Sequence, residues 1–121
     1  MENENKYQDV LGELKPSVLA LRNEIPEVWK GYADLHKAAM ADGELSGATK
    51  ELIALALAIV RQCDGCIASH ARSAVRRNVT PKQVAEMVGV TVLMSGGPAT
   101  VYGPRAFEAF LEFYSKSTST P

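Results

Sequence analysis

The residues best suited to chemistry are Cys63 and Cys66, which form one C-x-x-C motif and are the only two cysteines of the chain. A disulfide between them would close a very short loop, so it would restrain the unfolded chain little and would not staple a secreted fold. In a chain without a secretory signal, such a pair is typical of redox exchange or metal binding. We interpret it as a redox pair, with zinc binding and inert buried thiols as the alternatives.

His70 follows Cys66 by four residues, which places both on the same face of a helix. A helix beginning near Asp64 would hold Cys66 in its first turn, where unpaired backbone N–H groups and the helix macrodipole favour a thiolate. We therefore predict that Cys66 is the more acidic and more reactive thiol. His70 is then positioned to accept or return a proton.

Glu51 is the acid that interrupts the apolar surface of the preceding helix. A buried carboxylate needs a partner or a raised pKa, and a helix hairpin could bring Glu51 to the Cys/His cluster directly or through a water. The alternative is an acid that interacts with the dipole of its own helix. His36, on an apolar face with Trp29 and Tyr32, is interpreted as a packed or interface histidine.

The zinc alternative needs about four ligands. The cysteine pair and His70, with Glu51 or His36 as the fourth, could supply them. Because the sequence has no second C-x-x-C and no matching histidine pair, we predict neither a metal nor a cofactor.

The elements that position these residues are predicted to be helices, since the chain shows no strand-like alternation bounded by hairpin turns. Helix start signals are Pro16, Pro26, Ser46 and the Thr80-Pro81 pair. The predicted helices span residues 7–15 with a restart at Pro16, 26 to about 40, 46 to about 61, 64 to about 78 and 80 to about 95, followed by a last helix that carries Phe107, Phe110, Leu111 and Tyr114 on one face. The fold class is therefore all-α.

The run from Leu52 to Val60 is apolar on every side of its helix. Such a helix is buried all round, and a chain of 121 residues can hardly surround it alone. Nine residues are also too few to span a membrane. We therefore predict a homo-oligomer, with a self-contained helical bundle as the alternative.

The composition fits one globular domain over residues 1–121, with residues 115–121 expected to form a disordered tail. The formal net charge is −1, which is atypical of nucleic-acid binders, and Arg72, Arg76 and Arg77 are read as the solvated face of their helix. The N-terminal residues have no apolar signal core, so we expect a cytoplasmic protein. From the charge balance and the short apolar run, we expect neither nucleic-acid nor membrane partners.

Glu51, Cys63, Cys66 and His70 together spell E-x11-C-x-x-C-x-x-x-H. This pattern, with the flanking text KELIALALAIVRQCDGCIASHARSAV and GVTVLMSGGPATVYGPRAFEAF, resembles the alkylhydroperoxidase D-like (AhpD-like) branch of the carboxymuconolactone decarboxylase superfamily. The resemblance covers residues 35–113. One departure is Gly65, which stands where the best-known peroxidase members carry an additional histidine.

The resemblance implies an all-α domain of about six to seven helices around a central helical hairpin, with the C-x-x-C at its turn. It implies a homohexamer first and a trimer second. It also implies an antioxidant thiol peroxidase of the peroxiredoxin-activity class, which takes a small hydroperoxide or disulfide and an unidentified thiol reductant. Cys66 would attack the peroxide, Cys63 would resolve the product into a disulfide, and His70 with Glu51 would relay protons.

Two other functions compete with a thiol oxidoreductase. One is a cofactor-free lyase of the carboxymuconolactone decarboxylase type, with His70 and Glu51 as acid and base and the cysteines incidental. The other is a non-enzymatic oligomer that senses redox state or binds zinc. Loss of activity in a Cys66→Ser variant would separate the oxidoreductase from the lyase.

Overall fold

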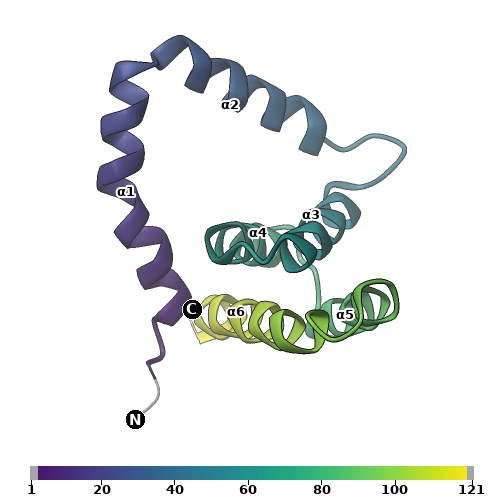
Figure 1. Ribbon diagram of the computed structural model, residues 1–121. Helices are drawn as coiled ribbons and strands as arrows, with labels where there is room; N and C mark the ends of the chain where they lie inside the picture. Colours follow the sequence, from purple (N-terminus) through teal and green to yellow (C-terminus); the bar gives the residue numbers. More distant parts are fainter. Residues whose placement is uncertain (1–2, 120–121) are drawn as a thin grey trace.

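The computed structural model describes residues 3–119, and this part of the chain contains six α-helices and no strand (Figure 1). The helices are α1 (Lys6–Glu24), α2 (Pro26–Met40), α3 (Gly47–Arg61), α4 (Asp64–Arg76), α5 (Pro81–Ser95) and α6 (Ala99–Ser119). The all-α prediction of six to seven helices is confirmed. Within this part of the chain, no helix is both long and apolar enough to cross a membrane.

The helix starts inferred from capping residues are confirmed for α3 and α5. Ser46 caps α3, because its side chain accepts the backbone N–H of Thr49 at 3.1 Å. Thr80 and Gln83 form a reciprocal capping box at the start of α5, whose first residue is Pro81. These caps satisfy N–H groups that have no partner inside the helix.

One helix start differs from the sequence-based prediction. Pro16 does not restart a helix but lies inside α1. The ring removes one hydrogen bond to the carbonyl of Gly12, and both residues are exposed, so water can take its place. The last helix begins at Ala99 and includes Pro104.

Residues 115–119, expected in a disordered tail, belong to α6. Ser117 and Thr118 donate their hydroxyls to carbonyls three residues earlier, and Lys116 donates to Asn5 Oδ1 at 2.6 Å, which ties this end of the helix to the start of the chain. The remaining tail residues, 120–121, lie outside the described part of the chain.

The core forms where α4 packs against α6 and α3, and where α5 packs against α6 and α3. Small side chains line this contact: Ala68, Ala71 and Ala74 of α4 and Ala106 and Ala109 of α6 are fully buried. Small residues at a helix contact let the helix axes approach closely. The hairpin of α3 and α4 therefore packs closely against α6.

Helices α1 and α2 form an arm that extends from this core (Figure 1). In the described chain the backbone of α2 lies close to α1 and α3, and none of the residues of α2 is buried. It exposes Val28, Tyr32 and Leu35 at 63–64 %. The arm is anchored at its other end, where Tyr7 of α1 is 2 % exposed.

We predict that Glu112→Ala loosens this anchor. One carboxylate oxygen of Glu112 accepts the N–H of Tyr7 at 3.1 Å and the other accepts the N–H of Gln8 at 2.9 Å, so α6 caps the first turn of α1. Because the substitution removes two hydrogen bonds to a charged group, we expect the free energy of unfolding to fall by about 1–3 kcal/mol. Urea denaturation measures this loss, with the exposed Glu86→Ala as the control, and equal stability of both variants would contradict it.

Candidate active site

The Cys63–Cys66 pair lies at the turn between α3 and α4. Helix α3 ends at Arg61 and is capped by Gln62, whose φ of 55° is left-handed, and the N–H of Cys63 donates to the carbonyl of Ala58 at 3.2 Å. This Schellman-type closure reverses the chain within two residues. The turn brings the start of α4 directly after the apolar helix, as the sequence predicted for the hairpin.

Cys63 and Cys66 are joined in a disulfide, with their Cα atoms 5.2 Å apart. Cys66 lies in the first turn of α4 and is exposed, whereas Cys63 is half-buried. We expected the helix N–H groups to favour Cys66. The capping hydrogen bond instead runs from the N–H of Cys66 to the Sγ of Cys63, at 3.2 Å, because Cys63 occupies the cap position of α4.

Glu51 and His70 form a direct contact across the hairpin, with Oε2 of Glu51 2.9 Å from Nδ1 of His70. The Glu51 side chain is 3 % exposed and that of His70 is 21 % exposed. An ionised carboxylate only accepts hydrogen bonds, so a neutral His70 donates from Nδ1 and keeps Nε2 as a proton acceptor. A buried acid thus fixes the orientation of a partly exposed base.

The ring of His36 lies against that of His70, with centroids 6.2 Å apart and planes inclined by 21°. From its spacing in the sequence, His36 was interpreted as a packed or interface histidine, or as a fourth ligand in the zinc alternative. Its residue type was the one available signal, because the docking of α2 against the hairpin is a tertiary contact. The structure brings both histidines of the chain to one site.

Gly65, between the two cysteines, faces α1. A Cβ atom built at Gly65 would lie 3.0 Å from Cδ1 of Leu14, so a larger side chain here requires Leu14 to move. Gly65 stands where the best-known peroxidase members carry an additional histidine. In this chain, α1 packs closely on the turn at that position.

The zinc alternative would use the two cysteines and His70 of this site. Within residues 3–119, no three His, Cys, Asp or Glu side chains converge closely enough to hold a metal ion. Both sulfurs that a zinc site would use are bonded to one another.

Comparison with known proteins identifies proteins that are similar to this chain in sequence and fold. The model of the carboxymuconolactone decarboxylase family matches residues 26–110. The crystal structure of the apo form of a carboxymuconolactone decarboxylase family protein from Legionella pneumophila is 39 % identical, covers 91 % of this chain and 98 % of its own, and superposes with a TM-score of 0.88. A Thermotoga maritima structure, 24 % identical with a TM-score of 0.72, covers 95 % of this chain and 98 % of its own and shares the fold.

Similar proteins of unassigned function also occur in other bacteria. An uncharacterized protein of Cupriavidus necator is 37 % identical over 83 % of this chain and 88 % of its own. One from Haemophilus influenzae is 32 % identical over 86 % and 92 %, respectively.

Proposed function

The chain belongs to the carboxymuconolactone decarboxylase family, and within that family we propose that it is a thiol-dependent oxidoreductase acting through Cys63 and Cys66. The observation that carries this proposal is the disulfide one helical turn before His70, whose ring is held by the buried Glu51. An accessible sulfur, a second sulfur in bonding range and an oriented base are the parts that a two-cysteine redox cycle requires.

In the oxidative half of the cycle, the Cys66 thiolate attacks the terminal oxygen of a hydroperoxide and becomes a sulfenic acid as the O–O bond breaks. The alkoxide that leaves takes one proton and departs as an alcohol. The Cys63 thiolate then attacks the Cys66 sulfur, and the hydroxide that leaves takes a second proton to give water. The peroxide gains two electrons, which the two thiols lose as the disulfide forms.

His70 supplies the proton transfer at the sulfur. With Nδ1 bound to Glu51, its Nε2 can take the thiol proton of Cys66, and Glu51 stabilises the imidazolium that results. The proton on Nε2 is then available to the alkoxide. His36, stacked on the same ring, limits the orientations open to His70 and acts as a positioning residue.

The reductive half of the cycle returns both thiols. A small thiol or a protein dithiol attacks the exposed Cys66 sulfur, and Cys63 leaves as a thiolate that the N–H of Cys66 stabilises. A second thiol then resolves the mixed disulfide and completes the two-electron reduction. The cycle requires a supply of reduced thiols, so we place the protein in the cytoplasm.

The exposed apolar surface supports assembly with further copies of the chain. On helix α3 the side chains of Ile53, Leu57 and Val60 are 46–59 % exposed, and helix α2 exposes further apolar side chains. Full burial of a large apolar side chain contributes about 1.5–3 kcal/mol, so a closed homo-oligomer would gain from covering them. We propose a hexamer, with a trimer as the second candidate.

A thiol count tests the redox proposal. We expect the reduced protein to hold two reactive thiols and stoichiometric hydroperoxide to remove both, with a mass loss of two hydrogens and one equivalent of alcohol formed. Thiols that persist under peroxide would reject peroxide reduction. If a small disulfide oxidises the pair where peroxide does not, the substrate is a disulfide. Two thiols inert to both oxidants would reject the oxidoreductase and leave the lyase and the non-enzymatic oligomer as candidates.

A further inference from the structure

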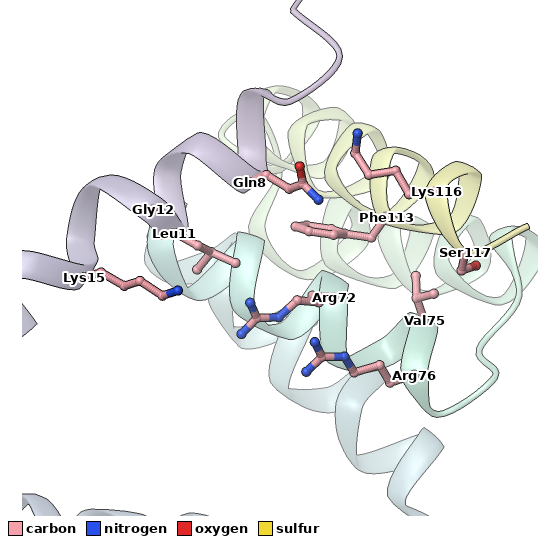
Figure 2. A pocket seen from close by; sticks show the side chains of 10 residues that line it. All are labelled: Gln8, Leu11, Gly12, Lys15, Arg72, Val75, Arg76, Phe113, Lys116 and Ser117. Atoms are coloured by element: carbon pink, nitrogen blue, oxygen red, sulfur yellow. The ribbon is translucent and has the colours of Figure 1, made fainter. Parts of the chain in front are cut away.

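A pocket with a volume of about 410 Å³ opens between α1, α4 and α6 (Figure 2). Its cations are Lys15, Arg72, Arg76 and Lys116, and none of its lining residues is acidic. Figure 2 shows Lys15 pointing from α1 towards the two arginines of α4, with Phe113 of α6 on the other side of the opening. Volumes of this size are typical of small-molecule sites.

Arg72 is the least satisfied of these cations. Its Nε is buried and has no hydrogen-bond partner within the described part of the chain, although a buried polar group normally has one. Burial, and then the charge of Arg76, lower the pKa of Arg72. Arg72 remains charged at neutral pH because guanidinium groups do not deprotonate in proteins. The fold thus holds two like charges side by side and buries part of one.

Among residues 3–119, no ion pair involves Arg72, Arg76 or Lys15. Glu112, on the same helix as Phe113, already accepts two backbone N–H groups of α1. Lys116 donates to Asn5, so it adds charge to the pocket while its ammonium is engaged.

Apolar side chains line the pocket beside the cations, together with the polar Gln8 and Ser117. Leu11 of α1, Val75 of α4 and Phe113 of α6 line the same opening as the arginines. A guanidinium fork matches the two oxygens of a carboxylate, and the apolar wall matches a short hydrocarbon or aromatic body. Inorganic phosphate would satisfy the charges and leave the wall uncovered.

We propose that this pocket binds a small amphipathic carboxylate, with the carboxylate on Arg72 and Arg76 and the apolar body against Phe113. The site lies on residues that the redox cycle does not use. It was missed in the sequence, where Arg72 and Arg76 fit the solvated face of their helix. Packing of α1 and α6 on either side of α4 is what turns that face into a pocket.

Calorimetric titration of the full chain with sodium octanoate tests this proposal. We expect saturable binding that weakens about tenfold or more in Arg72→Gln/Arg76→Gln, because hydrogen bonds to charged groups are lost. Arg22→Gln, which removes an exposed arginine elsewhere on α1, serves as the control and should bind octanoate like the unaltered protein. If the double variant fails to fold, Arg72→Lys and Arg76→Lys keep the charge, remove the fork and should still weaken binding.

Two further ligands and one further measurement separate the alternatives. Octanol should bind more weakly than octanoate because it lacks the anion, and inorganic phosphate should bind more weakly because it lacks the apolar body. Absence of octanoate binding, equal binding by phosphate, or equal binding by the double variant would overturn the proposal. Loss of the oligomer in Arg72→Gln/Arg76→Gln without any octanoate binding would assign the arginines to a subunit contact instead.

Discussion

Cys66→Ser should abolish peroxide-driven disulfide formation and leave Cys63 reacting with peroxide more slowly than Cys66 does in the unaltered protein. Cys66 is the exposed residue of the pair and lies one helical turn before His70, so its removal takes away the more accessible nucleophile of the proposed cycle. Peroxide consumption, followed by the loss of hydroperoxide in solution, measures the effect. The lyase alternative predicts no effect of this substitution on its own reaction.

Cys63→Ser is the matched variant, because it removes the other sulfur of the same motif. It should still consume one equivalent of peroxide and stop at a sulfenic acid on Cys66, which a dimedone adduct of defined mass would identify. The hydrogen bond from the N–H of Cys66 to Cys63 Sγ favours a thiolate at Cys63. Faster alkylation of Cys63 than of Cys66 in the reduced protein would therefore reverse the two roles.

Local signals in the sequence predicted much of the fold. Caps such as Ser46 and Thr80 act within a few residues, so their helix starts could be inferred and are confirmed. The prediction that a helix restarts at Pro16 was wrong. At this exposed position the proline removes one hydrogen bond of the helix, which water can replace. The end of α6 could not be inferred, because the contact of Lys116 with Asn5 joins opposite ends of the chain.

Some features of the candidate site could likewise be predicted from the sequence, and others could not. The hairpin was predicted, and it brings Glu51 to His70 directly. The contact of His36 with His70 depends on how α2 docks, which helical periodicity does not encode. The buried Nε of Arg72 likewise results from the packing of α1 and α6 around α4. Short-range spacing thus predicted the catalytic candidates, whereas residues supplied by distant helices emerged from the tertiary structure.

The burial of the apolar helix α3 agrees only in part with the prediction, and the difference decides which residue best tests assembly. The sequence predicted burial of residues 52–60 on all sides. In the isolated chain Leu55 is fully buried, whereas Leu57 is 59 % exposed. A charge at Leu55 would therefore damage the fold itself and report little on assembly. A charge at Leu57 meets water in the monomer and meets protein only in an oligomer.

Leu57→Glu should therefore dissociate the oligomer and leave the helical fold intact. An unpaired charge in an apolar contact costs several kcal/mol, so we expect the dissociation constant to rise by about a hundredfold or more. Sedimentation at low micromolar concentration should show the unaltered protein at about six times the 13.1 kDa of one chain and the variant at smaller mass, with unchanged helical circular dichroism. Lys82→Glu, an exposed charge change on α5, is the control and should sediment like the unaltered protein. If the unaltered protein sediments near 13.1 kDa, the oligomer is rejected. Helix α2 and the outer face of α3 would then stay in contact with water.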